Sequence, residues 1–262
     1  MCLHARTLVI GQLSVKYPRA FLRITLLLGI LFVGVLIVVI LAFKVKRGIP
    51  DQGFQKVSRR WFAAIAWVLG IKVKTFGTAK DQPALWVSNH ISWSDILVIG
   101  AHSQVGFLSK KEVQSWPVIG WVVAHGGTLF IDRGTKNAAD NAAKEITRHV
   151  QHGHSILVFP EGTTGDGEDL RRFHARIFAP VLDNQLLVQP VALKYVDPQG
   201  KRSREIKFVD DIGILDSARN VLLAKNIHVE LHFLPSVNGT DFSARKALAQ
   251  DLQASIGEVV RS

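Results

Sequence analysis

The chain has 262 residues, of which 48% are hydrophobic, and it carries a formal net charge of +11. A chain of this size can bury one sizeable core, with or without a membrane element. The charge is uneven, because residues 1–60 hold ten Lys or Arg and one acid, whereas the remainder holds 22 basic and 20 acidic residues. A globular part so close to neutral argues against a nucleic-acid binder. The single cysteine, Cys2, excludes an intramolecular disulfide scaffold.

An uninterrupted apolar run of twenty residues covers Ile24 to Phe43. As a helix rising about 1.5 Å per residue it spans roughly 30 Å, the hydrocarbon thickness of a bilayer. The run is longer than the apolar region of a signal peptide and ends without a small-residue cleavage site. We therefore expect residues 1–53 to form a membrane anchor with basic flanks, as a spanning helix or a re-entrant hairpin. The denser basic cluster downstream favours a cytoplasmic location for residues 54–262.

The segment that follows the apolar run predicts a short helix and then a strand. Basic residues at Arg59 and Arg60 lead into an apolar stretch with two tryptophans, which suits either the membrane interface or a core helix. Gly70 ends this helix. Residues Ile71 to Phe76 alternate between apolar and Lys, which is typical of a half-buried strand at a sheet edge.

Strands and helices then alternate to the end of the chain. The apolar patterns predict strands at 84–87, 105–108, 128–131, 156–159, 186–193 and 229–233, and helices at 118–124, 136–152 and 244–259. This order indicates a single α/β domain at residues 54–262, with a mixed sheet between helices.

The stretch from Ala84 to Leu97 concentrates polar chemistry between a predicted strand and a predicted helix. It places His90 at the strand-to-helix turn. Ser92 and Asp95 have the spacing of a helix capping box, so Asp95 has a structural interpretation as a carboxylate of the first turn. Alternatively, Asp95 accepts the Nδ1 proton of His90 and leaves Nε2 to take a proton from a hydroxyl. A carboxylate has two oxygens, so both interpretations can hold.

Three further stretches lie at predicted strand ends or within a strand. Arg133 follows the strand at 128–131, where a guanidinium can hold phosphate or carboxylate, although a surface pair with Asp132 is the alternative. Pro160 and Gly162 impose a turn that presents Glu161, which is otherwise a solvated carboxylate. Pro190 interrupts an apolar strand and predicts an edge, a bulge, or backbone left open to a ligand.

Taken in order, these stretches resemble the four blocks of the glycerolipid acyltransferases of the lysophosphatidic acid acyltransferase type. That family carries N-H-x-x-x-x-D, a block ending F-I-D-R, then F-P-E-G-T, and a V-P-V-like block. The resemblance covers roughly Trp61 to Pro235. The blocks stand in this chain as Asn89, His90 and Asp95; Phe130 to Arg133; Phe159 to Thr163; and Val188 to Val191.

The resemblance implies an O-acyltransferase that uses an acyl thioester and a lysolipid in a membrane. His90 would act as general base on the free hydroxyl of the lysolipid, and Asp95 would orient the imidazole. The acyl donor would be acyl-coenzyme A or acyl-carrier protein, with no further cofactor and no metal. The resemblance places the acceptor head group against Arg133, Glu161, Gly162, Thr163, Pro190 and Arg176.

The chain departs from the family after the third block. The family commonly continues with R-S and later F-K-x-G, whereas here Thr164 and Gly165 follow Thr163. Arg171, Arg172 or Arg176 would replace the lost charge, or the departure signals another head group. We expect 1-acyl-sn-glycerol-3-phosphate as the acceptor, giving phosphatidic acid, with a lyso-ornithine lipid as the alternative.

Two other functional classes remain to be weighed. A membrane-anchored lipid-binding protein without turnover is disfavoured by the intact His90 and Asp95. A serine hydrolase would need a nucleophile, and the sequence has no G-x-S-x-G elbow. The histidines at 149, 152 and 154 are expected to be solvated at a helix end rather than to form a metal site.

Overall fold

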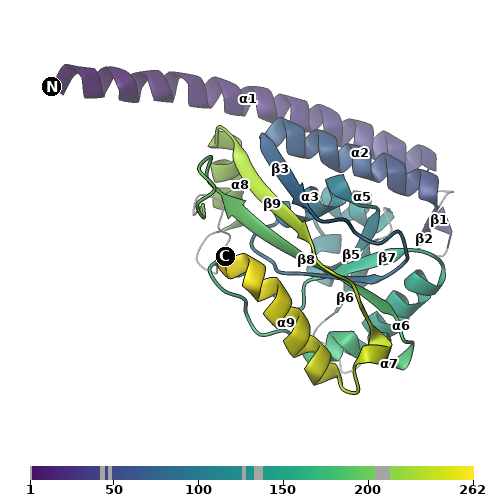
Figure 1. The fold of residues 1–262 in the computed structure, drawn as a ribbon. Helices are drawn as coiled ribbons and strands as arrows, with labels where there is room; N and C mark the ends of the chain where they lie inside the picture. The colour runs from purple at the N-terminus through teal and green to yellow at the C-terminus, as the bar shows by residue number, and fades with distance from the viewer. Residues whose placement is uncertain (1, 42–44, 47–48, 126–127, 133–137, 204–212) are drawn as a thin grey trace.

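The computed structural model of the chain describes residues 2–41, 45–46, 49–125, 128–132, 138–203 and 213–262. Its strands are β1 (Val45–Lys46), β2 (Ile49–Pro50), β3 (Ile71–Phe76), β4 (Leu85–Ser88), β5 (Val105–Lys110), β6 (Leu129–Ile131), β7 (Ser155–Val158), β8 (Leu187–Val196), β9 (Ile227–Phe233) and β10 (Val237–Asn238). The first two form a small hairpin, and the others form one sheet in the order β3-β9-β8-β4-β7-β5-β6, with β10 paired to β8 (Figure 1).

The sheet is mixed, as the sequence predicts. Strands β8, β4, β7, β5 and β6 run parallel to one another, whereas β9 runs antiparallel to β8 and parallel to β3. The prediction that Ile71–Phe76 forms an edge strand is confirmed, because β3 pairs only with β9 within the part of the chain that the structure describes. The carboxyl ends of the five parallel strands share one edge of the sheet.

Helices cover both faces of the sheet (Figure 1). The α-helices are α1 (Cys2–Leu41), α2 (Gln52–Leu69), α3 (Ser94–His102), α4 (Lys111–Gln114), α5 (Ile119–His125), α6 (Ala138–Gln151), α7 (Ala179–Asp183), α8 (Ile214–Leu223) and α9 (Arg245–Arg261). Two short 3₁₀ helices are η2 (Ala175–Phe178) and η3 (Gly239–Asp241). Residues 136 and 137 of the helix predicted at 136–152 lie outside the described residues.

Alternate residues of β4 point into two separate apolar cores. Trp86 joins the core beneath α2, α3 and α8, whereas Leu85 and Val87 join the core beneath α6, α7 and α9. This is the two-residue period expected of a strand that is buried on both faces. The central position of β4 fixes the turn that follows it, where His90 lies.

The proline of β8 corrects one sequence prediction. Pro190 does not lie on an edge strand, because β8 pairs with β4 on one side and with β9 and β10 on the other. The ladder is interrupted opposite Pro190: β9 ends at the partner of Val191, and β10 begins at the partner of Val188. Leu234 N donates to Pro190 O at 3.0 Å on that side. Pro190 has no N–H to donate, and it lies in the gap between β9 and β10, so no hydrogen bond of the ladder is lost.

Helix α2 begins earlier than predicted. Asp51 caps its amino end by accepting a hydrogen bond from Phe54 N at 2.7 Å, and Gly70 ends it with a φ of 75°. That left-handed conformation is the reason a glycine is needed there. The expected domain boundary at residue 53 falls in the first turn of α2 and stays a prediction.

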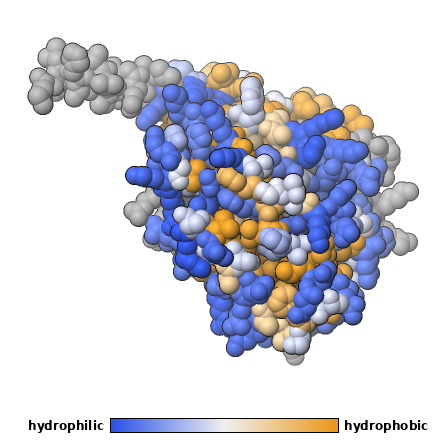
Figure 2. Space-filling view, in the orientation of Figure 1, coloured by the Kyte–Doolittle hydropathy of each residue, from blue (hydrophilic) through white to orange (hydrophobic). Residues whose placement is uncertain are grey.

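The apolar helix α1 lies lengthwise against the α/β domain. Near its middle the buried Arg23 donates to the carbonyls of Leu222 and Ala224 at the carboxyl end of α8. About two turns further on, Trp61 Nε1 of α2 donates to Ile30 O at 3.0 Å. About two turns beyond that, Val38 is buried against α2 and α5. Figure 2 shows apolar side chains along the upper edge of the molecule, where α1 lies. The exposed ones are Tyr17, Phe21, Leu22, Ile24, Leu26, Leu28, Phe32, Val33, Leu36, Val39 and Ile40.

Candidate active site

The turn after β4 is held to the neighbouring strand β8 by Asn89. Its side-chain Nδ2 donates to Leu193 O at 3.0 Å, and its Oδ1 accepts from Leu193 N at 2.8 Å. Asn89 is buried, so both polar ends of its amide are satisfied by one residue of β8. This pair places the next residue, His90, at the shared carboxyl edge of the parallel strands.

His90 and Asp95 form a hydrogen-bonded pair. His90 Nδ1 lies 2.8 Å from Asp95 Oδ2, and the carboxylate is fully buried while the His90 side chain is 19% exposed. A carboxylate only accepts, so Nδ1 carries the proton and Nε2 is left as the basic nitrogen. The sequence prediction that Asp95 bonds His90 across the turn agrees with this geometry.

The same oxygen of Asp95 also holds the turn. Oδ2 accepts from Ile91 N at 2.7 Å and from Ser92 N at 2.9 Å. The reciprocal half of the predicted capping box is absent, because Asp95 N donates to the backbone carbonyl of Ser92 rather than to its hydroxyl. A single atom, Oδ2, therefore both holds the turn and binds His90, so the structural and the chemical interpretations of Asp95 hold together.

Tyr195 of β8 binds the second oxygen of Asp95. Its hydroxyl donates to Oδ1 at 2.6 Å and lies 2.8 Å from the hydroxyl of Ser94. Burial and the neighbouring Asp95 charge raise the pKa of Tyr195 well above its usual value, so the phenol stays protonated and remains a donor. Sequence reasoning missed Tyr195, because it lies 100 residues beyond Asp95 and no short motif joins the two.

Two segments after β7 pack around His90. The Phe159 ring stacks on the imidazole with centroids 4.0 Å apart and an interplanar angle of 14°. Gly165 N donates to His90 O at 2.7 Å, and Gly167 lies against Ile91 with a φ of 72°. The ring of His90 is thus fixed by packing as well as by Asp95.

Glu161 lies behind His90 and is buried rather than solvated, and its predicted contact with a head group stays a prediction. Its Oε1 accepts from His90 N at 2.8 Å, and its Oε2 accepts from Arg171 N at 2.8 Å. Burial raises the pKa of Glu161, although the two backbone N–H groups oppose that shift. The carboxylate therefore joins the His90 turn to the segment that begins at Arg171.

Some of the other predicted substrate-binding residues lie close to the His90 turn in the fold. Gly162 adopts a φ of 76°, and Thr163 beside it is half-buried. Pro190 pairs with Val87, two residues before Asn89. Arg176 is exposed on η2. Arg133 lies outside the described residues.

An acidic loop replaces the basic continuation of the third block. Asp166, Glu168 and Asp169 lie between Gly165, which touches His90, and Arg171. Asp169 pairs with Arg261 of α9 at 2.9 Å, and the N–H of Leu170 together with Arg261 lowers the pKa of Asp169. The loop thus carries three acidic residues between Gly165 and Arg171, one of which is paired with Arg261.

Comparison with known proteins shows which family has this arrangement. The family model described as Acyltransferase matches residues 70–194. The lyso-ornithine lipid O-acyltransferase of Pseudomonas aeruginosa is 36% identical over 202 residues, which is 77% of each chain. The chain belongs to the acyltransferase family.

The names of one further relative of this acyltransferase and of one solved structure state a different acceptor from that of the Pseudomonas aeruginosa protein. The 1-acyl-sn-glycerol-3-phosphate acyltransferase of Neisseria gonorrhoeae is 29% identical over 220 residues, covering 82% of this chain and 86% of its own. The crystal structure of the 1-acyl-sn-glycerophosphate acyltransferase PlsC from Thermotoga maritima matches with a TM-score of 0.66 at 20% identity, covering 96% of this chain and 95% of its own. That likeness confirms the predicted fold class.

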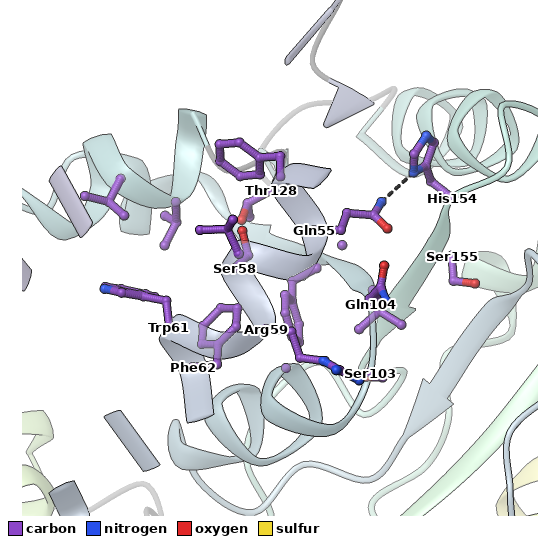
Figure 3. A pocket seen from close by; sticks show the side chains of 18 of the residues that line it. Gln55, Ser58, Arg59, Trp61, Phe62, Ser103, Gln104, Thr128, His154 and Ser155 are labelled. Atoms are coloured by element: carbon purple, nitrogen blue, oxygen red, sulfur yellow. Dashed lines mark hydrogen bonds between the residues drawn. The ribbon is translucent and has the colours of Figure 1, made fainter. Parts of the chain in front are cut away.

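One cavity of this acyltransferase lies away from His90. It encloses about 870 Å³ of space free of protein atoms, part of it open to solvent, between α1, α2, α5 and the amino ends of β5 and β7. Figure 3 shows Trp61 and Phe62 on one side of it, and the hydrogen bond between Gln55 and His154 on the other. Gly100, at the carboxyl end of α3, lines it, whereas His90 precedes the amino end of α3.

The cavity also corrects the prediction about the three histidines. His149 is buried rather than solvated, and its Nδ1 donates to Glu145 O at 2.9 Å. His154 is half-buried, and burial together with the neighbouring His149 lowers its pKa. His152 is exposed, as predicted. The helical pattern of the sequence did not show which of these side chains faces the cavity.

Proposed function

We propose that this acyltransferase moves an acyl group from a thioester to the free hydroxyl of a lysolipid, with His90 as the general base. The observation that supports the proposal is the pair of His90 Nδ1 and Asp95 Oδ2 at 2.8 Å, on a turn at the carboxyl edge of the sheet. Ligands of α/β proteins bind at that edge. Nε2 is then the nitrogen available to a substrate hydroxyl.

In the proposed reaction His90 accepts one proton and later returns it. Nε2 takes the proton of the lysolipid hydroxyl as its oxygen attacks the thioester carbonyl carbon. The tetrahedral intermediate then collapses, the carbon–sulfur bond breaks, and the leaving thiolate takes the proton back from His90. Asp95 stabilises the imidazolium in between, and Tyr195 and two backbone N–H groups hold Asp95 in place. The products are an ester and a free thiol, and no acyl-enzyme forms.

Arg171 is our candidate for the head group, beside Arg133 and Arg176. The backbone N–H groups of Arg171 and His90 both donate to the carboxylate of Glu161. The side chain of Arg171 therefore starts close to the His90 turn. Arg133 follows β6 in the sequence and lies outside the described residues. A guanidinium at either place suits a carboxylate or a phosphate.

We propose a lyso-ornithine lipid as the first candidate acceptor and 1-acyl-sn-glycerol-3-phosphate as the second. The zwitterionic head group offers a carboxylate to Arg171 and an ammonium to the acidic loop of Asp166 and Glu168. A phosphate monoester would meet those acids with like charge. The 36% identical relative supports the first candidate, and the Neisseria gonorrhoeae relative supports the second.

The hydrocarbon of the substrates needs an apolar place. The cavity along α1 and α2 provides one, since Trp61, Phe62 and Phe107 line it. The donor is acyl-coenzyme A or acyl-carrier protein, and the activity assay below distinguishes the two.

We further propose that α1 lies in one face of the membrane rather than across it. The helix touches the α/β domain at Arg23 and again at Val38, fifteen residues or about 22 Å further on. A bilayer crossing along that length would take the polar domain into hydrocarbon. The side of α1 that faces away from the domain is apolar, which suits the boundary between head groups and acyl chains.

The decisive experiment is an acyl-transfer assay with both lysolipids in competition and with each thioester donor in turn. His90→Ala should lower kcat by about 10² to 10⁴, because that is the usual effect of removing a general base. His152→Ala is the matched control, because its side chain is exposed and should leave the rate unchanged. If His90→Ala retains more than about a tenth of the activity, His90 is not the base. Binding of lysolipid without turnover in the parent protein would instead support the lipid-binding alternative.

A further inference from the structure

A second apolar surface lies outside α1. Residues 115–121, the segment SWPVIGW that joins α4 to α5 and includes the first three residues of α5, are here named the Trp116 tip. Four large apolar side chains of this tip are strongly exposed: Trp116 at 40%, Val118 at 48%, Ile119 at 45% and Trp121 at 39%. Four such residues within six positions form a patch rather than scattered exposure.

The tip is held in a defined shape. Gly120 N donates to Trp116 O at 3.0 Å, and Trp116 N donates to Val113 O at 3.1 Å. A Cβ at Gly120 would come within 2.3 Å of Gln114 O, so the chain closes on itself there. Val118 adopts a φ of 61°, which is strained for a β-branched side chain. The fold thus holds these side chains outward at a conformational cost.

The tip continues the apolar face of α1. Val122, one helical turn beyond Val118, is buried in a cluster with Val38 of α1 and Phe54 of α2. The outer face of α1 carries exposed Leu36, Val39 and Ile40 at the level of that contact. The two exposed surfaces therefore adjoin.

The chain reaches the tip from the edge of the sheet that holds His90. It follows α4, which begins directly after Lys110 at the carboxyl end of β5. Strand β5 is parallel to β7 and β4, so its carboxyl end lies at the same edge as the turn of His90. Exposed Lys110 and Lys111 border the tip, and Lys111 pairs with Asp132.

We propose that the Trp116 tip inserts into the interfacial layer of the same membrane leaflet that receives α1. The occupant of this surface is a phospholipid bilayer. Tryptophan is enriched at the head-group level, and lysine beside it meets anionic lipid. Continuity with α1 favours a bilayer over a protein partner. This inference rests on the proposed membrane association of α1.

Depth measurement tests the insertion directly. In a Cys2→Ser background, Ile119→Cys, Leu28→Cys on the outer face of α1 and Lys246→Cys on the exposed side of α9 each receive an environment-sensitive fluorophore. The labelled proteins bind vesicles of phosphatidylethanolamine and phosphatidylglycerol that carry nitroxide lipids. We expect a blue shift and quenching at 119 and 28, and neither at 246.

The outcomes separate this inference from the proposal on which it rests. Quenching at 28 with water-like emission at 119 overturns insertion of the tip and leaves the membrane association of α1 standing. Water-like emission at both positions overturns both. Quenching at all three, including 246, also overturns the inference, because the tip is then not distinguished from the rest of the domain.

A kinetic test checks whether insertion serves the reaction. The double variant Trp116→Gln and Ile119→Gln should lower kcat/KM for vesicle-embedded lysolipid by about tenfold or more, because two inserted apolar side chains are lost. With the same lysolipid as monomers below its aggregation concentration, kcat/KM should change by less than about twofold. An equal loss on both substrate forms would overturn the inference, provided that thermal unfolding shows the variant to be folded.

Discussion

Oδ2 of Asp95 accepts hydrogen bonds from the His90 ring and from two backbone N–H groups, while Oδ1 accepts from Tyr195. All four donors approach a carboxylate that is fully buried. Buried polar networks of this kind are stable only when each member is satisfied. The residue that orients the proposed base is therefore also a structural residue, and a substitution at Tyr195 separates the two roles better than one at Asp95.

Tyr195→Phe removes one donor and leaves the turn of Asp95 intact. The unpaired Oδ1 should cost about 1 to 3 kcal/mol, which lowers Tm by roughly 2 to 10 °C. Negative charge then concentrates on Oδ2 and stabilises the imidazolium, so the acidic limb of the kcat profile should move to higher pH. Calorimetry and pH-rate profiles measure the two effects. Tyr17→Phe, at an exposed position of α1, is the control. An unmoved acidic limb would contradict a link from Tyr195 to the base.

Glu161→Gln tests whether this carboxylate holds the His90 turn or a substrate. An amide has one oxygen for two backbone donors, so the turn loosens and kcat should fall more than the acceptor KM rises. A rise in KM with unchanged kcat would instead support the contact with a head group that the family resemblance implies.

The pH dependence of stability gives a second measurement on Glu161. Burial raises its pKa above the usual 4.5, so the folded state binds a proton more tightly than the unfolded state. The free energy of unfolding of the parent, relative to Glu161→Gln, should therefore fall as the pH rises from 4.5 through the raised pKa, and then stay level. Thermal unfolding across that pH range shows it. Glu258→Gln, exposed on α9, should show no such difference.

At the scale of elements, Arg23 joins α1 to α8. Its guanidinium donates to the carbonyls of Leu222 and Ala224 and, at 3.2 Å, to that of Lys225. Arg19 Nη2 donates to Leu223 O at 2.6 Å beside it. These are the orphan carbonyls at the end of a helix, so two arginines of α1 act as the carboxyl-terminal cap of α8. The basic flank of the apolar run is thus part of the fold.

Arg23→Met keeps the apolar stem of the side chain and removes the donors. Losing charge-assisted bonds to buried carbonyls should destabilise the protein by about 1 to 3 kcal/mol. Amide hydrogen exchange should rise at residues 219–225, while exchange in α9 stays unchanged. Lys16→Met, at an exposed position of the same helix, serves as the control. Equal exchange in the two variants would show that α1 does not cap α8.

At the scale of the whole molecule, the placement of α1 predicts that its two ends lie on one side of the membrane. In a Cys2→Ser background, Lys16→Cys and Ser262→Cys should both react with a membrane-impermeant maleimide in inside-out vesicles, and neither should react in right-side-out vesicles. A helix that crosses the bilayer from Ile24 to Phe43 would place residues 16 and 262 on opposite sides. Labelling of the two positions from opposite sides would therefore restore the spanning anchor.

The elements and the proposed pair of His90 and Asp95 were readable from the sequence because their signals are local. The signals for the apolar run of β4, for the glycine that ends α2 and for the pairing of His90 with Asp95 each lie within a few residues of one another in the sequence. Side-chain periodicity and turn chemistry act over that distance. The family blocks added the order of the strand ends, and the mixed sheet followed from the alternation of strands and helices.

What the tertiary structure decided lies between residues far apart in the chain. Glu161 meets His90 N across 71 positions, and Tyr195 meets Asp95 across 100. The burial of His149 and the interruption opposite Pro190 likewise depend on which elements pack alongside. An apolar run of given length has the same composition whether it crosses a bilayer or lies on a domain. The proposal that α1 lies along the domain rests on the contacts of Arg23 and Val38, because burial is set by packed neighbours and not by local pattern.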